Sequence, residues 1–150
     1  MRAVIQRVTG CRVAVEGQAV ARSGNGLLVL LGIGKSDGEK DASYLCEKIV
    51  NLRLFEGPGG EMDRSILDLQ DATLTVVSQF TLFGDCRKGR RPSFSNAAPR
   101  ERASDLYEYF LECASTYLLR VQSGQFRAMM DITLENRGPV TILLDSKKEF

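Results

Sequence analysis

The alternation of apolar and polar positions predicts a chain built mainly of short strands. Ala3–Val8 and Arg12–Val15 are apolar stretches ended by turn residues, as strands are. Leu27–Ile33 is apolar without alternation, which indicates a strand covered on both faces. We expect further strands at Leu52–Phe55, Asp71–Thr81, Met129–Leu134 and Val140–Leu144.

Two segments instead have the spacing of helices. Ser36 and Asp37 can cap a helix that begins near Gly38. Its expected buried stripe is Ala42, Leu45, Cys46, Ile49 and Val50. A second and longer helix is predicted over residues 99–119, with Pro99 suited to its first turn.

About seven strands with two helices that do not alternate regularly predict an α+β fold. We expect one domain over residues 1–150, a barrel-like and mostly antiparallel sheet flanked by two main helices. Residues 56–60 form a loop too short to link two domains. The tail, residues 146–150, is expected to be frayed.

The stretch 71–83 passes from core to polar residues. Leu74, Val76 and Val77 are typical of a buried strand, and in residues 78–81 (SQFT) small hydroxyls then appear where the apolar pattern would continue. A strand end of this kind can hold a polar ligand against a rigid base. The turn at Gly84 leads into the most basic run of the chain, which contains Arg87, Lys88, Arg90 and Arg91.

A second polar segment, Asn136–Thr141, lies before the last predicted strand. Its Gly138 permits the close approach of another backbone, and its Pro139 fixes φ and can form a cis peptide bond. A tight turn at the start of a strand is the simpler interpretation of this pair.

The composition limits the classes of protein and of reaction that are possible. The 150 residues are 43% apolar and 26% charged, as in an ordinary globular domain. There is no signal peptide and no apolar run long enough to cross a membrane, so we expect a cytoplasmic protein. The four cysteines are widely spaced, which predicts free thiols in a reducing compartment rather than disulfides or zinc ligands. Cys86, beside basic residues, is a candidate reactive thiol.

Histidine is absent from the sequence. This excludes Ser-His-Asp and Cys-His catalysis and histidine-type zinc sites. An enzyme with this sequence has to act through positioning, backbone groups or a group of its substrate, and we expect no metal and no cofactor. Between residues 87 and 102 the chain has six cations and one anion, which suits a phosphate-bearing ligand, although a solvated loop has the same composition.

Two motifs together carry a family resemblance. SQFTLF at residues 78–83 and NRGPVT at residues 136–141 resemble the D-aminoacyl-tRNA deacylases, which remove D-amino acids from tRNA in translation. Residues 5–8 (IQRV) and 91–94 (RPSF) are also similar to that family. The resemblance extends from Met1 to about Asp145.

The resemblance implies hydrolysis of the ester between a D-amino acid and the terminal ribose of tRNA. Such an ester needs little activation, so the neighbouring ribose hydroxyl can assist while the protein supplies geometry and oxyanion donors. Ser78, Gln79, Phe80 and Thr81 would form the floor of the pocket. Thr81 could instead be a nucleophile, but no base to activate it is evident.

The resemblance also implies how chirality is read. Gly138 and Pro139 would form a cis peptide that enters the pocket of the other subunit of a homodimer, and Arg7 would brace this loop. Rejection of L side chains by collision cannot exclude glycine, so glycyl-tRNA is an expected second substrate.

For the nucleotide part, the resemblance assigns the adenine platform to Phe126, with Met130 and Ala103 nearby, and Arg87, Lys88, Arg90 and Arg91 would meet tRNA phosphates. Two other classes stay open: a noncatalytic RNA- or adenosine-binding module, and a small regulatory domain that binds amino acids. The first needs no intact pairing of the two motifs, and the second needs no basic loop.

Overall fold

A long N-terminal strand organises the fold. A computed structural model gives the structure of residues 1–117 and 119–149. The elements are β1 (Arg2–Val15), β2 (Gln18–Ser23), β3 (Gly26–Gly32), α1 (Glu39–Asn51), β4 (Phe55–Glu56), β5 (Met62–Arg64), η1 (Ile66–Asp68), β6 (Thr73–Ser78), η2 (Phe80–Phe83), α2 (Arg100–Ser115), β7 (Arg120–Ser123) and β8 (Asp131–Asp145).

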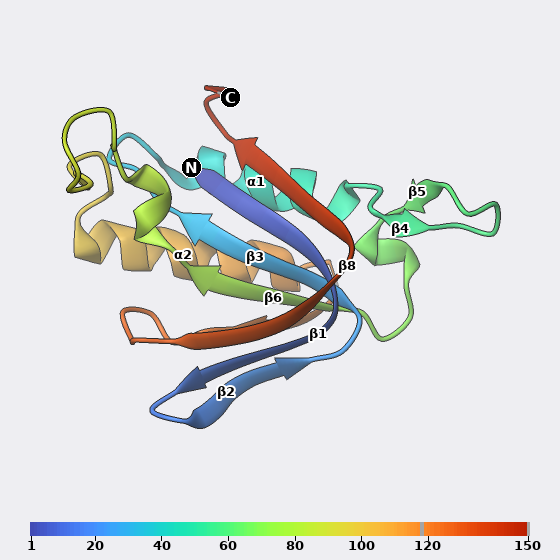
Figure 1. Ribbon diagram of the computed structural model, residues 1–150. Coiled ribbons are helices and arrows are strands. Elements are labelled where there is room, and N and C mark those ends of the chain that lie inside the picture. The colour runs from blue at the N-terminus through green and yellow to red at the C-terminus, as the bar shows by residue number, and fades with distance from the viewer. Residues whose placement is uncertain (118, 150) are drawn as a thin grey trace.

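The main sheet is mixed and strongly curved. Strand β1 pairs antiparallel with β2, β3 and β8, whereas β6 runs parallel to both β3 and β7. The backbone N–H of Arg22 in β2 donates to the side-chain oxygen of Gln122 in β7 at 2.7 Å, so the two ends of the strand order approach each other. Figure 1 shows this curl, with α1 and α2 on the same face of the sheet. The predicted barrel-like α+β fold with two helices is therefore confirmed.

The curl creates two hydrophobic cores. The larger lies between the sheet and the helices, and it contains the fully buried Leu45, Ile49, Tyr107 and Phe110. The smaller lies inside the curled sheet around Val8, Val13, Leu28 and Val77. Each fully buried side chain of this size contributes roughly 1.5–3 kcal/mol through loss of exposed apolar surface. Strand β3 is covered on both faces, as its continuous apolar run predicts.

Several predicted boundaries are wrong for identifiable reasons. The two strands expected within residues 3–15 are one strand, because β8 pairs with β1 along nearly all of its length. The strand expected over 71–81 ends at Ser78, because Gln79 N–H donates to Leu31 near the end of β3 and the chain then coils into η2. The helix expected over 99–119 ends at Ser115, where the N–H groups of Thr116 and Tyr117 close its last turn. Leu118, within that expectation, lies outside the described residues.

The last two predicted strands also form one element, β8, which has an irregularity in its middle. Val8 pairs with Asn136 and Gln6 with Thr141, so residues 137–140 bulge out opposite Arg7. Proline has no N–H to donate to a ladder, which is why it occurs at bulges rather than in regular pairing. Gly138 and Pro139 thus interrupt the pairing of β8 without ending it.

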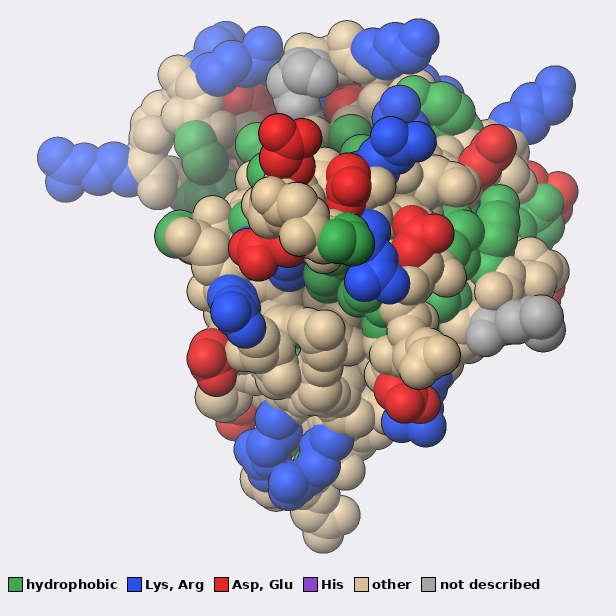
Figure 2. All heavy atoms as spheres, turned by 90° about the vertical axis from the view of Figure 1, so that its right-hand side faces the viewer, with side chains coloured by type: hydrophobic (Ala, Val, Ile, Leu, Met, Phe, Trp, Pro, Cys, Tyr) green, Lys and Arg blue, Asp and Glu red, His purple; other side chains and the backbone are tan. Residues whose placement is uncertain are grey.

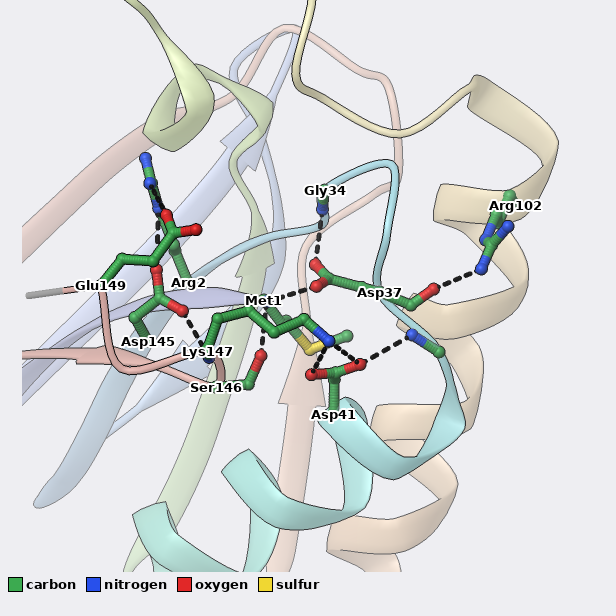
Figure 3. Close-up of polar contacts among 11 residues, drawn as sticks. Met1, Arg2, Gly34, Asp37, Asp41, Arg102, Asp145, Ser146, Lys147 and Glu149 are labelled. Carbon is green, nitrogen blue, oxygen red and sulfur yellow. Dashed lines mark hydrogen bonds and ion pairs between the residues drawn. The ribbon is translucent and has the colours of Figure 1, made fainter.

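The C-terminal segment is docked rather than frayed over residues 146–149. Figure 3 shows the α-ammonium of Met1 between the side chains of Asp37 and Ser146, 2.6 Å from an oxygen of each. Lys147 pairs with Asp41 at 2.8 Å. The second carboxylate oxygen of Asp37 accepts the N–H of Gly34, so Asp37 does not cap α1 as predicted; Gly38 occupies that position. Phe150, also part of the predicted tail, lies outside the described residues.

Within the described residues, neither helix is long and apolar enough to cross a membrane.

The Asp41–Lys147 pair predicts a specific dependence of stability on pH. Burial disfavours the ionised carboxylate of Asp41, but hydrogen bonds from Lys147, Ser146 and the backbone of Gly38 outweigh burial and lower its pKa to about 2. A lowered folded-state pKa stabilises the fold above the ordinary carboxyl value, and this contribution is lost as pH falls from about 4 to about 2. Asp41→Asn should therefore lose less unfolding free energy over this range than the wild type, as measured by urea denaturation.

The matched control is Asp105→Asn, which removes an exposed carboxylate from α2. Its unfolding free energy should change with pH as the wild type does. An unaltered pH dependence in Asp41→Asn would contradict the assignment.

Candidate active site

A cavity of about 390 Å³ lies where the curled sheet opens beside the start of α2. It is bounded by the C-terminal ends of β3 and β6, the first turns of η2 and α2, and the segment before β8. Six of the predicted site residues come together here, from three parts of the chain: Ser78, Gln79, Phe80, Ala103, Phe126 and Met130.

The end of β6 shapes the polar part of the cavity. Gln79 N–H makes the last hydrogen bond to β3, and the chain then turns into η2, where the N–H of Leu82 is the first to find an acceptor within the turn. The amides of Phe80 and Thr81 therefore have no partner inside η2. Backbone N–H groups in this state can stabilise a developing negative charge.

Two of the four SQFT residues depart from the predicted pocket floor. The Phe80 side chain is 59% exposed, so it forms the rim of the cavity. Thr81 does not line the cavity, and its hydroxyl accepts a hydrogen bond from the side-chain amide of Gln79. Arg127 is the one charged side chain among the described residues that line the cavity. Within the described residues, no carboxylate or lysine thus lines the cavity as a general base.

Tyr107 supports Phe126 from below. The ring centroids are 5.8 Å apart, and the Tyr107 hydroxyl donates to the carbonyl of Val76 at 2.8 Å. Burial raises the pKa of Tyr107, so its hydroxyl stays a neutral donor. Sequence reasoning missed this role, because helical periodicity identifies Tyr107 as core without showing which aromatic residue it touches.

The Gly138–Pro139 loop is a second rigid element. Its Gly138–Pro139 peptide is cis, as the resemblance implies. The side chain of Asn136 closes the loop by accepting the N–H of Val140 at 2.8 Å and donating to the carbonyl of Val140 at 3.2 Å. Arg7 donates to the carbonyl of Arg137 at 3.0 Å, which agrees with its expected bracing position. The part of Asn136 was missed, although this residue belongs to the motif.

Only glycine suits position 138. Its φ is +136°, and a Cβ there would lie 2.8 Å from the Val140 side chain and 3.0 Å from the guanidinium of Arg7. A backbone in this region is disfavoured for residues with a side chain. The loop is thus built for one conformation.

This loop is remote from the cavity of its own chain. Arg7, opposite the loop, pairs with Leu27 at the start of β3, whereas Leu31 at the other end of β3 lines the cavity. Four residues of strand span about 13 Å. Figure 1 shows the bend of β8 at the opposite end of the sheet from the C-terminal ends of β3 and β6. Gly138 and Pro139 therefore do not reach their own cavity.

The basic run forms a closed hairpin, which we call the basic hairpin, over residues 85–93. Asp85 and Ser93 exchange backbone hydrogen bonds of 2.8 and 3.0 Å. Arg87 does not act as a free cation, because its guanidinium makes two hydrogen bonds to the Asp85 carboxylate, at 2.9 and 2.7 Å, and these bonds hold the pKa of Asp85 well below its usual range. Lys88, Arg90 and Arg91 are exposed and form no ion pair with another described residue.

The exposed charges of the basic hairpin that are left after Arg87 pairs with Asp85 are all positive. Figure 2 shows the face on the right of Figure 1, where acidic and basic side chains lie interspersed. The three unpaired cations of the hairpin thus form the more selective surface for an anion.

The remaining candidate groups have no part in this arrangement. Cys86 is exposed at the basic hairpin and lines a separate cavity with Arg2 and Arg87, and its reactivity stays a prediction. Burial, together with the neighbouring Cys113, raises the pKa of Cys46 to about 12, as suits a core thiol. Among the residues that the structure describes, no three His, Cys, Asp or Glu side chains gather as a metal site would require.

The sequence and the fold have clear relatives. The model of the family described as D-Tyr-tRNA(Tyr) deacylase matches residues 4–145. The chain is 56% identical to the D-aminoacyl-tRNA deacylase of Thermosipho africanus and 55% identical to that of Koribacter versatilis, with all of both chains covered in each case.

Solved structures have the same fold. The structure titled c-Myc DNA Unwinding Element Binding Protein superposes with a TM-score of 0.90 at 40% identity, over 97% of this chain and 98% of the other. A probable eukaryotic D-amino acid tRNA deacylase gives a TM-score of 0.83 at 17% identity, over 95% of this chain and 97% of the other. With a family model that spans nearly the whole sequence and full-length relatives above 50% identity, the chain belongs to the D-Tyr-tRNA(Tyr) deacylase family.

Proposed function

We propose that this protein hydrolyses the ester bond of D-aminoacyl-tRNA and releases the free D-amino acid and tRNA. The observation that carries the proposal is the cavity in which Ser78, Gln79 and Phe80 meet Phe126, in a chain whose full-length relatives are named D-aminoacyl-tRNA deacylases. The reaction belongs to proofreading in translation, and we place it in the cytoplasm, where aminoacyl-tRNA is used.

Catalysis depends on backbone groups and on the substrate. No titratable carboxylate, lysine or thiol lines the cavity within the described residues, so the neighbouring ribose hydroxyl is the group that assists attack on the carbonyl. The backbone amide of Phe80, which lines the cavity and has no partner inside η2, donates to the oxyanion that forms. Ser78 holds the amino group or the carbonyl of the substrate.

Chirality is read by a second copy of the chain. The Gly138–Pro139 loop does not reach its own cavity, so in a homodimer it enters the cavity of the partner. There it leaves room for hydrogen or a D side chain and collides with an L side chain. Arg7 and Asn136 hold the loop against displacement. Glycine escapes this collision, so glycyl-tRNA is also a substrate.

The nucleotide part of the substrate binds along one side of the cavity. The terminal adenine stacks on Phe126, which Tyr107 supports, with Met130 and Ala103 beside it. Lys88, Arg90 and Arg91 bind phosphates of the acceptor stem, while Arg87 keeps the basic hairpin closed. Phosphate contacts give affinity without reading sequence.

Paired deacylation tests the proposal. D-tyrosyl-tRNA, L-tyrosyl-tRNA and glycyl-tRNA are each incubated with catalytic amounts of the protein, without added metal. Rapid loss of the D-ester and the glycyl ester, with the L-ester spared, is expected. Survival of all esters while tRNA binds would establish the noncatalytic RNA-binding module instead. Binding of free amino acid without tRNA would establish the regulatory domain.

Gly138→Ala should weaken chiral selection. The added Cβ would collide with Val140 and Arg7 at an unfavourable φ, so the loop must shift. The ratio of D- to L-tyrosyl-tRNA hydrolysis should fall on the order of tenfold or more, as expected when a pocket loses a close steric fit. The matched control is Gly59→Ala, whose Cβ meets nothing within 4 Å. An unaltered ratio in Gly138→Ala would exclude the loop as the filter.

Thr81→Ala should retain most of the hydrolysis of D-tyrosyl-tRNA, since its hydroxyl is engaged by Gln79 and does not line the cavity. Single-turnover rates measured with excess enzyme isolate the chemical step from binding. Complete loss of hydrolysis with intact tRNA binding would restore Thr81 as a nucleophile.

Neutralising the basic hairpin should change the salt dependence of binding. For Arg90→Gln or Arg91→Gln, the slope of log affinity against log salt should decrease by about 0.7–0.9 per lost phosphate contact. Fluorescence titration of tRNA at several salt concentrations measures this slope. Lys40→Gln, an exposed cation on α1, is the control and should leave it unchanged.

A further inference from the structure

Two exposed aromatic side chains lie between the cavity and the basic hairpin. Phe80 at the cavity rim is 59% exposed, and Phe94, directly after the hairpin, is 38% exposed. Their ring centroids are 5.0 Å apart and the ring planes meet at 69°, an edge-to-face contact. In this geometry the rings do not cover each other's faces completely, and their exposure shows that the protein does not cover them either.

The backbone holds Phe94 firmly on both sides. Before it, Ser93 is bonded to Asp85 at the base of the basic hairpin. After it, Ala98 N–H donates to the carbonyl of Ile33 at 2.9 Å, and both Ala98 and Ile33 line the cavity. The backbone of Phe94 is therefore held in place on the short segment between the cavity and the hairpin.

A glycine makes room for the ring of Phe94. A Cβ on Gly84 would lie 3.2 Å from that ring, which is closer than ordinary van der Waals contact. The ring thus lies against bare backbone on one side. Phe94 and Phe80 form a contiguous pair of exposed aromatic side chains, and a contiguous apolar surface, unlike a single exposed apolar residue, indicates a binding surface.

We propose that Phe94 is a stacking platform for the base of the nucleotide that precedes the terminal adenosine. The inference rests on the proposed function, because it needs the 3′ end of an RNA in the cavity. With the terminal adenine on Phe126 and the phosphates of the stem at Lys88, Arg90 and Arg91, the single-stranded RNA between them passes over Phe80 and Phe94.

The chemistry fits a nucleobase better than a protein partner. Single-stranded RNA is bound by stacking its bases on aromatic side chains beside a cationic groove, and stacking accepts every base. The exposed aromatic residue and the unpaired cations are adjacent here, on one continuous segment of chain. A site of this kind adds affinity for any tRNA without selecting among tRNA species.

The test compares two substrates that differ in this base. Phe94→Leu keeps an apolar side chain against Phe80 but removes the aromatic face. The kcat/KM for D-tyrosyl-tRNA should fall about tenfold, within the range measured for loss of one stacked base. The kcat/KM for the D-tyrosyl ester of adenosine, which lacks the second base, should not fall with it, so the ratio of the two values changes.

Two control variants accompany it. Phe94→Tyr keeps the aromatic face and should retain the wild-type ratio. Tyr44→Leu removes an aromatic residue of similar exposure, 39%, from α1, away from the cavity, and should also retain it. A changed ratio in Tyr44→Leu would show that the effect is unspecific and would overturn the proposal.

A cycle with the RNA identifies the contact itself. A D-tyrosyl-tRNA with an abasic nucleotide before the terminal adenosine should be hydrolysed by the wild type about as slowly as Phe94→Leu hydrolyses the intact substrate. Combining the two changes should cause no further loss. If the two losses in kcat/KM instead added in full, the proposal would be overturned.

The remaining outcomes also distinguish stacking from other roles of Phe94. Equal losses on both substrates would make Phe94 a support for Phe80 and refute stacking, and no loss on either would refute any role for its ring. Failure of the proposed function is distinguishable, because the wild type would then not hydrolyse the intact D-tyrosyl-tRNA at all.

Discussion

The structure depends on the pairing of β1 along both of its edges. One edge of β1 is bonded to β3 and then to β2, and the other is bonded to β8 over nearly its whole length. This doubly paired strand joins the N-terminal and C-terminal parts of the chain in the middle of the curled sheet. The curl opens the cavity at one end of the sheet and leaves the Gly138–Pro139 bulge at the other. The separation of pocket and loop is thus a consequence of the strand pairing.

Much of the fold was predictable because burial repeats along the sequence. The stripe of α1 and the unbroken apolar run of β3 each depend on local spacing, and both are confirmed. The predictions that were wrong depend on contacts between residues that are distant in the sequence. The end of β6 is determined by where its partner strand β3 stops. The position of the C-terminal tail is determined by contacts with Asp41 and Met1. No local pattern in the sequence shows these contacts.

The site was predictable to a similar extent. The two motifs identify the residues, and the structure brings Ser78, Gln79 and Phe80 close to Phe126. The motifs do not show that Thr81 lies off the cavity, or that Arg87 is occupied by Asp85. The role of Tyr107 was missed because its ring contacts Phe126, which belongs to a different part of the chain. No local sequence pattern shows that these two residues meet.

The closed base of the basic hairpin bears on the thermodynamics of RNA binding. A flexible cationic loop loses conformational entropy when it orders on a phosphate backbone, and this loss opposes binding. Here Asp85 already fixes the hairpin through Ser93 and Arg87 without RNA. Asp85, although acidic, therefore favours association with a polyanion. Because it orders the hairpin before RNA binds, less conformational entropy is lost on binding.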